Sequence, residues 1–372
     1  MGHIRSYELT FFLGDSCNLD CTYCYLNDYR ESNNSLDLTF GKAGIDKYIG
    51  TNSRQTTRLR FYAVGEPTLE FTLMKDLYDY AKNIYPNVTA ELQTSGYWIR
   101  KDGQFDEDMA NWIASNIDMV WISHDGLPNI HNQQRPTLDK KGSVDIVEKT
   151  IKVLLNGHSK VGVRPTISSL SVDKMVEIVE YFYDLGIKYI YFDPLKHQQG
   201  KHIKNVGKSI YNISLTKFAK FYVPAWQRAQ ELDIFCGSFL TINFDEPVEH
   251  FCRSCLGAPH LTVDGYIAVC DEASGGGRDE RFRSMIIGKY DKTTGKIIEY
   301  PEVINKLYER TPKNMSPCNK CNVADNCGGG CLGTANFHFG DINKTLPDFC
   351  RAVHYLAKHI PRNQGLFPVT HP

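Results

Sequence analysis

The distribution of its twelve cysteines constrains this chain more than any other feature of the sequence. Three lie within residues 17–24, none between residues 25 and 235, and nine between residues 236 and 350. Because the chain shows no secretory segment, the cysteines are better interpreted as metal ligands than as disulfides. The uneven spacing therefore predicts two parts, a domain of residues 1–235 and a cysteine-rich domain of residues 236–372.

The first group of cysteines is a C-x3-C-x2-C run formed by Cys17, Cys21 and Cys24, directly after an apolar segment that resembles a strand. Soft thiolates this close together select iron–sulfur clusters, zinc or Cu(I). A structural zinc site needs four ligands, and no fourth cysteine or histidine lies near the run. The run therefore favours a four-iron cluster with one iron left open to a small molecule; a zinc site is the alternative.

Residues 6–195 read as six strand–helix repeats. Short strands, often apolar throughout, that alternate with amphipathic helices indicate a parallel sheet buried on both faces. Six repeats fall short of an eight-unit barrel, so the predicted fold is α/β, a partial (β/α)6 TIM-like barrel followed by a small cysteine-rich α+β domain. The expected strands are Tyr7–Leu13, Arg58–Ala63, Thr89–Thr94, Met119–Ser123, Val161–Thr166 and Tyr189–Phe192, and the expected helices are Phe40–Ile49, Leu73–Ile84, Glu107–Ser115, Val144–Leu155 and Val172–Leu185.

Polar residues follow the expected strands. In such barrels the chemistry collects at the C-terminal ends of the strands, so these residues predict one shared site. The cysteine run follows the first strand, and the later positions include Gly65-Glu66-Pro67, Gln93-Thr94-Ser95-Gly96, Ser123-His124-Asp125-Gly126, Arg164-Pro165 and Asp193-Pro194.

The cysteine run and Tyr25, the aromatic residue after it, resemble the cluster motif of the radical S-adenosylmethionine (radical SAM) superfamily, in which the open iron binds that cofactor. The resemblance extends to Val64-Gly65-Glu66-Pro67, similar to a GGEP segment, and to the polar segments after the third and fourth strands. It implies that Glu66 holds the cofactor's ammonium and that Ser123 and Asp125 meet its ribose. The implied cofactor contacts are Tyr25, Gly65, Glu66, Gln93, Ser95, Ser123 and Asp125; for each, a turn residue that caps a strand or helix is the alternative.

The C-terminal cysteines follow the order C-x9-G-x4-C, C-x2-C-x5-C-x3-C, then C. This order resembles the SPASM domain, which holds two auxiliary clusters in radical SAM enzymes that modify peptides and proteins; zinc is again the alternative. The resemblance implies three [4Fe–4S] clusters in all. Cys318, Cys321, Cys327 and Cys350 would hold the outer auxiliary cluster, and Cys255, Cys270, Cys331 and Cys252 the inner one, with Cys236 as the reserve ligand.

The layout is similar to that of anaerobic sulfatase-maturating enzymes, in which an aspartate at the position of Asp271 acts as a base; a turn aspartate is the alternative. The family chemistry implies that a 5′-deoxyadenosyl radical takes a hydrogen atom from a peptide or protein side chain. We expect an oxidative peptide maturase that forms a thioether, a carbon–carbon or carbon–oxygen cross-link or a double bond. The alternatives are a formylglycine-generating sulfatase maturase, a small-molecule radical dehydrogenase and a non-enzymatic iron–sulfur electron carrier.

Charge and hydropathy restrict the partners. The chain has 42 basic and 43 acidic residues, so no net field attracts nucleic acid. No apolar run reaches the length of a membrane span, so we expect a cytoplasmic protein without membrane contact. The expected partners are a peptide or protein substrate and an electron donor such as flavodoxin or ferredoxin.

Overall fold

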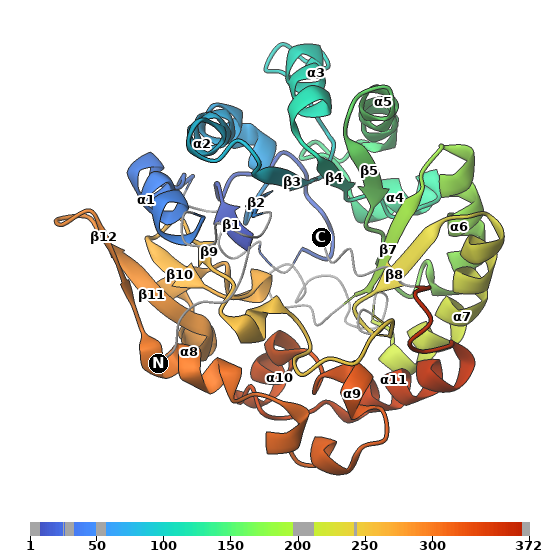
Figure 1. Cartoon of the computed structure of the whole chain (residues 1–372). Coiled ribbons are helices and arrows are strands. Elements are labelled where there is room, and N and C mark those ends of the chain that lie inside the picture. The colour runs from blue at the N-terminus through green and yellow to red at the C-terminus, as the bar shows by residue number, and fades with distance from the viewer. Residues whose placement is uncertain are drawn as a thin grey trace. The chain divides into compact units, whose positions relative to one another are not determined.

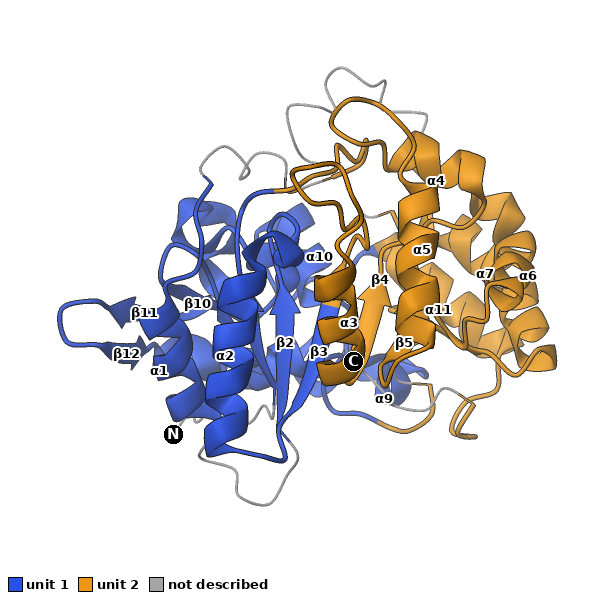
Figure 2. Cartoon of the chain, turned by 90° about the horizontal axis from the view of Figure 1, so that it is seen from above, with its two compact units in different colours: residues 1–16, 29–92, 248–346 blue, residues 17–28, 93–247, 347–372 orange. Residues whose placement is uncertain are grey.

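The structure is a computed structural model that describes residues 8–24, 26, 33–49, 57–195, 212–241 and 244–366. It contains two compact units, which Figure 2 shows in blue and orange. Unit 1 comprises residues 1–16, 29–92 and 248–346, and unit 2 comprises residues 17–28, 93–247 and 347–372. Each unit combines segments far apart in the sequence, so the units divide the chain differently from the predicted domains 1–235 and 236–372, which remain a prediction.

Unit 1 is built on a mixed sheet. Strand β9 pairs parallel with β1, β1 with β2, and β2 with β3, whereas β10, β11 and β12 continue antiparallel from β9. Gly265 lies in the turn between β9 and β10, with its backbone in the left-handed region. The strands are β1 (Glu8–Phe12), β2 (Arg58–Tyr62), β3 (Thr89–Thr94, whose last two residues belong to unit 2), β9 (His260–Leu261), β10 (Tyr266–Ala268), β11 (Ile286–Asp291) and β12 (Lys296–Glu299).

Helices cover one side of the parallel strands of unit 1. Asp37 begins α1 by accepting hydrogen bonds from the backbone N–H groups of Thr39 and Phe40. In Figure 1, α1 and α2 lie outside β1 and β2, and both bury apolar side chains. The helices of this unit are α1 (Leu38–Tyr48), α2 (Phe71–Ile84), α8 (Pro301–Tyr308), α9 (Ala324–Cys327) and α10 (Leu332–Phe339).

Alternation along β1 and β2 separates an apolar face from a polar one. Phe11 stacks on Phe61 with their ring centroids 5.5 Å apart, and burying each ring stabilises the sheet by about 1.5–3 kcal/mol. The neighbouring positions are also buried but polar: Arg60 pairs with Glu91 at 3.1 Å and donates to Thr10 at 3.2 Å. The strands are therefore buried on both faces, as predicted, but one face carries ion pairs.

Unit 2 contains a parallel sheet in which β4 pairs with β5, and β7 pairs with β5, β6 and β8. The single strand expected over Val161–Thr166 is interrupted at Pro165, because proline has no N–H for the ladder. Its carbonyl oxygen still accepts from the Asp193 N–H at 3.1 Å. The strands are β4 (Met119–Ile122), β5 (Lys160–Val163), β6 (Thr166–Ile167), β7 (Tyr189–Pro194) and β8 (Phe235–Ser238).

In its described residues, unit 2 contains six helices, several of which lie on the outer side of its sheet in Figure 1. Phe218, Tyr222 and Trp226 of α7 are buried. The Asp348 carboxylate at the start of α11 accepts from the Leu215 N–H at 2.6 Å, which ties α11 to the start of α7. The helices are α3 (Glu107–Asn116), α4 (Pro128–Gln134), α5 (Val144–Leu155), α6 (Met175–Asp184), α7 (Leu215–Glu231) and α11 (Pro347–His359).

The alternation of parallel strands and helices predicted from the sequence is confirmed, with three strand positions in each unit. The sequence analysis missed α4 and β8, and the helix expected from Val172 begins as a 3-10 turn before α6. Residues 196–211, after the last expected strand, lie outside the described residues. Among the described helices, none is long and apolar enough to cross a membrane.

Candidate active site

The cysteine run is fixed by backbone pairing within unit 2. Residues 19–22 lie antiparallel to residues 134–137: the Asp20 N–H donates to the Pro136 carbonyl at 2.8 Å, and the Thr22 N–H donates to the Gln134 carbonyl at 2.9 Å. This register places Cys21 opposite Arg135. The Cys24 N–H also donates to the Cys21 carbonyl at 3.2 Å, so these two cysteines share one tight turn.

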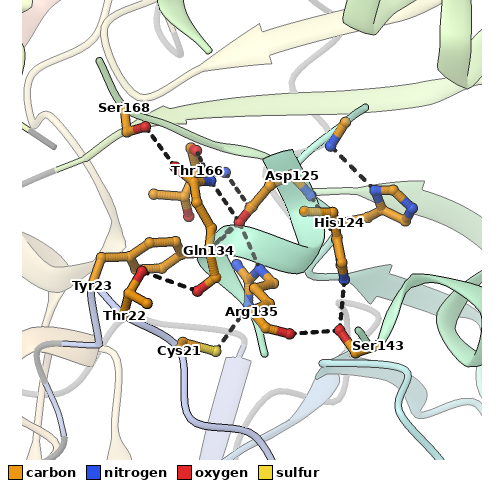
Figure 3. A network of polar contacts seen from close by, with 12 residues as sticks. Cys21, Thr22, Tyr23, His124, Asp125, Gln134, Arg135, Ser143, Thr166 and Ser168 are labelled. Atoms are coloured by element: carbon orange, nitrogen blue, oxygen red, sulfur yellow. Dashed lines mark hydrogen bonds and ion pairs between the residues drawn. The ribbon is translucent and has the colours of Figure 1, made fainter. Parts of the chain in front are cut away.

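Asp125, after β4, is the centre of the polar network in Figure 3. Its carboxylate is fully buried and accepts hydrogen bonds from four groups. The donors are the Tyr23 hydroxyl at 2.8 Å, Gln134 Nε2 at 2.9 Å, Arg135 Nε at 3.0 Å and the Thr166 N–H at 2.9 Å. In this structure Asp125 joins the cysteine run to α4 and β6; its contact with a ribose hydroxyl stays a prediction.

Burial fixes the protonation of this network. Burial raises the pKa of Tyr23 well above its ordinary value, so the phenol stays protonated. Its hydroxyl donates a hydrogen bond to Asp125. Burial lowers the pKa of His131 to about 3, so its ring is neutral. Nδ1 of His131 accepts from the Asp125 N–H at 3.2 Å, and Nε2 lies 3.0 Å from Ser143 Oγ. The neutral imidazole therefore orients the backbone at Asp125.

Other polar residues predicted at the strand ends also lie in unit 2. Arg164 donates from Nη1 to Gln93 Oε1 at 2.6 Å and from Nη2 to Asp193 Oδ2 at 2.6 Å, which links the ends of β3, β5 and β7. The Ser95 hydroxyl accepts from the Tyr97 N–H at 3.2 Å. Ser123 is half-buried at the end of β4, and Tyr25 lies outside the described residues.

Gly65 and Glu66 follow β2 in unit 1. The Glu66 N–H donates to the Ser16 carbonyl at 2.7 Å, and a Cβ atom at Gly65 would lie 1.8 Å from the same oxygen. Only glycine therefore permits this approach to the segment before the cysteine run. The buried Glu66 carboxylate caps the following 3-10 turn by accepting from the Thr68 N–H at 3.2 Å and from the Thr68 hydroxyl at 2.7 Å.

Four C-terminal cysteines come together in unit 1. The Cys255 N–H donates to the Cys252 carbonyl at 3.1 Å, and the thiols of this pair are hydrogen-bonded. Cys270 interacts electrostatically with Cys331 and Cys252. The Cys252 hydrogen bond and the nearby Arg310 lower the pKa of Cys255 to about 7. This arrangement supports Cys252 as the fourth member of the predicted inner set.

The remaining cysteines are divided between the units. Cys318, Cys321 and Cys327 lie in unit 1, where the Cys321 N–H donates to the Cys318 carbonyl at 3.0 Å and Cys327 ends α9. Cys350 lies on α11 of unit 2. Cys236 is a buried free thiol on β8 of unit 2, and its burial raises its pKa.

Asp271, the predicted base, is paired with a buried histidine. Nε2 of His260 lies 3.1 Å from Asp271 Oδ1, and the Asp271 side chain is 38% exposed. Nδ1 of His260 lies 2.9 Å from the Ala258 carbonyl, which only accepts, so Nδ1 carries a proton. Nε2 of His260 is thus the ring atom that faces the Asp271 carboxyl group.

The donor set fits iron–sulfur groups. In the described part of the chain, no group of three or more His, Cys, Asp or Glu side chains is placed to hold a single metal ion. A four-iron cluster, in contrast, inserts iron and sulfide between its thiolates and needs them further apart. Buried guanidinium groups also lie 3.9 Å from the sulfur atoms of Cys21 and Cys255, where a cation favours a thiolate.

The sequence analysis did not identify Tyr23, Gln134, Arg135, His260 or Arg310 as functional residues. One signal was available for two of them, because Pro128 shortly after Gly126 is a typical first residue of a helix and indicates α4, which carries Gln134 and ends at Arg135. The others acquire their positions from contacts distant in the sequence.

No family model matches the chain. A cysteine-type anaerobic sulfatase-maturating enzyme of Clostridium novyi (strain NT) is 24% identical over 336 residues, which cover 85% of each chain. The solved structure of native anSMEcpe with bound AdoMet matches with a TM-score of 0.71 and 17% identity, over 95% of this chain and 96% of that one. Streptococcus suis SuiB bound to precursor peptide SuiA matches with a TM-score of 0.61 and 16% identity, over 92% of this chain and 75% of that one.

The likeness to anSMEcpe confirms the predicted fold class, a partial α/β barrel with a cysteine-rich C-terminal region. Together with the cysteine pattern, the similar proteins support S-adenosylmethionine binding and an iron–sulfur nature. The chain is a radical S-adenosylmethionine enzyme with a SPASM-type C-terminal region, similar to the anaerobic sulfatase-maturating enzymes.

Proposed function

We propose that this enzyme oxidises a side chain of a peptide or protein substrate. The observation that carries the proposal is the anchoring of Cys17–Cys24 to the Asp125 network, at the ends of strands that also present Gln93 and Ser123. A cluster on this run with S-adenosylmethionine supplies a 5′-deoxyadenosyl radical. The chain's own contribution is to hold the three thiolates, to position the cofactor and substrate, and to exclude water.

The proposed ligand sets are those of the sequence analysis. Three [4Fe–4S] clusters would be held by Cys17, Cys21 and Cys24, by Cys252, Cys255, Cys270 and Cys331, and by Cys318, Cys321, Cys327 and Cys350. The proposed cofactor contacts are Tyr25, Gly65, Glu66, Gln93, Ser95, Ser123 and Asp125.

Asp271 is the proposed base. Loss of a hydrogen atom leaves a substrate radical, which must lose one electron and one proton to become the oxidised product. Oδ1 of Asp271 lies 3.1 Å from Nε2 of His260, and the partly exposed carboxylate is accessible to a proton from a substrate. A cluster held by Cys252, Cys255, Cys270 and Cys331, of which Cys270 directly precedes Asp271, would accept that electron first. Flavodoxin or ferredoxin is the proposed donor of the electron needed for cofactor cleavage.

Two substrates within this class are supported by the comparisons. The Clostridium novyi relative supports a sulfatase, in which a cysteine or serine becomes formylglycine. The SuiB structure with its precursor peptide supports a short ribosomal peptide that is cross-linked or dehydrogenated.

The test is anaerobic incubation of the reconstituted protein with S-adenosylmethionine, dithionite and each candidate substrate. Chromatography measures 5′-deoxyadenosine, and mass spectrometry follows the substrate. Oxidation of serine or formation of a cross-link removes two hydrogens, whereas conversion of cysteine to formylglycine also replaces sulfur with oxygen. Separate incubations show which substrate is modified, and the mass change distinguishes conversion of cysteine from the other two outcomes.

The variant Cys17→Ala is expected to abolish 5′-deoxyadenosine formation and to lower the iron content by one cluster. The matched control is Cys236→Ala, which removes a cysteine outside the proposed sets and is expected to retain both. Cofactor cleavage by the Cys17→Ala protein would reject the proposed role of the run.

A further inference from the structure

Two buried arginines approach cysteine sulfur in the same way. Nη1 of Arg135 lies 3.9 Å from Cys21 Sγ in unit 2, and Nη1 of Arg310 lies 3.9 Å from Cys255 Sγ in unit 1. The arginines are 8% and 0% exposed. A buried guanidinium is costly unless its donors are used, so both positions are specified by the fold.

Arg135 is held in place on two further sides. Its Nε donates to the buried Asp125 carboxylate at 3.0 Å, and its Cζ lies 5.2 Å from the centre of the Tyr23 ring. The backbone pairing of residues 19–22 with 134–137 sets Cys21 opposite it. Figure 3 shows the guanidinium between Asp125 and Cys21. One of the remaining N–H groups, on Nη1, points to the sulfur.

Arg310 is held by carbonyl groups. Its Nε donates to the Ile342 carbonyl at 2.6 Å and its Nη2 donates to the Gly329 carbonyl at 3.0 Å, which leaves Nη1 for Cys255. None of the ion pairs found among the described residues includes Arg310. The same N–H to sulfur contact thus occurs at both cysteine groups, although the two supports differ.

We propose that Arg135 and Arg310 are positioning residues that raise the reduction potentials of two iron–sulfur clusters by donating N–H···S hydrogen bonds to Cys21 and Cys255. The inference rests on the proposed function, in which these cysteines are cluster ligands. Reduction adds one electron to a cluster and makes it more negative. A buried cation with an N–H aimed at a ligand sulfur stabilises that reduced form more than the oxidised one.

The test is a potentiometric titration of the reconstituted full-length protein, with dithionite as reductant and electron paramagnetic resonance as the readout. S-adenosylmethionine is added to identify the cluster whose signal it changes. The variants are Arg135→Gln and Arg310→Gln. The matched control is Arg228→Gln, which removes a surface arginine paired with Glu180 and Glu231.

Arg135→Gln is expected to lower the ratio of reduced to oxidised N-terminal cluster about tenfold at a given potential, equivalent to about 59 mV for one electron. The auxiliary clusters should keep their potentials. Arg310→Gln should lower one auxiliary potential and leave the N-terminal one unchanged. Arg135→Lys keeps the positive charge but lacks the planar guanidinium, so it should lower the potential of the N-terminal cluster by less than Arg135→Gln does. It replaces Arg135→Gln if that variant does not fold.

An unchanged or higher potential in a variant overturns the role of that arginine, and equal shifts at all clusters overturn both roles. These failures differ from failure of the proposed function. If the wild-type chain binds no cluster on Cys17, Cys21 and Cys24, the proposed function fails. If it binds a cluster whose potential is unchanged in the Arg135 variants, only this inference fails.

Discussion

The N-terminal cysteine run in unit 2 and the inner cysteine group in unit 1 carry the same guanidinium–sulfur contact on different supports. Arg135 is neutralised by the buried carboxylate of Asp125, whereas Arg310 is held by the carbonyls of Ile342 and Gly329. The run presents three cysteines within eight residues, and the inner group draws four from positions 252–331. One site is built from a local motif and the other from distant segments.

The difference indicates a division of chemical work. In the proposed function, three cysteines would leave one iron open for the cofactor, and four would close a cluster for electron transfer. The run is fixed by a neutral network of phenol, imidazole and one ion pair. The inner group instead includes Cys270, which directly precedes the partly exposed Asp271, the proposed base.

The largest expected effect tests this division directly. Asp271→Asn keeps the size of the side chain but removes the base, so we expect cofactor cleavage to remain and product formation to fall by about 10²–10⁴-fold. The measurement is the ratio of modified substrate to 5′-deoxyadenosine in the anaerobic assay. Loss of cofactor cleavage in this variant would break the comparison, because a residue beside the inner cysteine group would then be needed for the first step.

The control for this variant is Asp264→Asn, which changes a turn aspartate of the same unit that accepts from the Gly277 N–H. It is expected to leave the ratio of product to 5′-deoxyadenosine near that of the wild type. A similar loss in both variants would mean that the effect reflects disturbance of the C-terminal region and not a base at Asp271.

Local patterns explain which parts of this molecule were predictable. The strands and helices around Val144–Leu155 and Thr89–Thr94 follow from apolar periodicity, and Asp125 was identified because it follows a strand. Arg135 was not, because its partner Cys21 is 114 residues away and no local pattern marks the contact. Strand β8 was missed because its segment, which includes Cys236 and Gly237, is short and shows no alternation.

The second prediction compares the stability of the two supports. Asp125→Asn leaves a buried guanidinium without its counter-charge, so we expect a loss of about 3–5 kcal/mol. Arg310→Gln removes the charge itself and leaves at most two carbonyls with weaker partners, so we expect a loss of about 1–3 kcal/mol. The measurement is urea denaturation of the reconstituted proteins, followed by far-ultraviolet circular dichroism. Equal losses would show that the ion pair at Arg135 contributes nothing beyond its hydrogen bonds.

The last prediction concerns pH and only the support in unit 2. The pKa of His131 falls from about 6.5 in the unfolded chain to about 3 in the folded one, because burial disfavours the imidazolium. Between these values the unfolded chain binds a proton that the folded chain does not. The neutral His131 therefore makes its full contribution to the free energy of unfolding above about pH 6.5. This contribution is lost as the pH falls towards 3, by at most about 1.4 kcal/mol per pH unit. His131→Asn should reduce the slope of unfolding free energy against pH in this window by that amount, whereas the exposed His158→Asn should not. An unchanged slope in the His131→Asn protein would mean that the neutral imidazole does not hold the backbone at Asp125 and that the run is supported by the carboxylate alone.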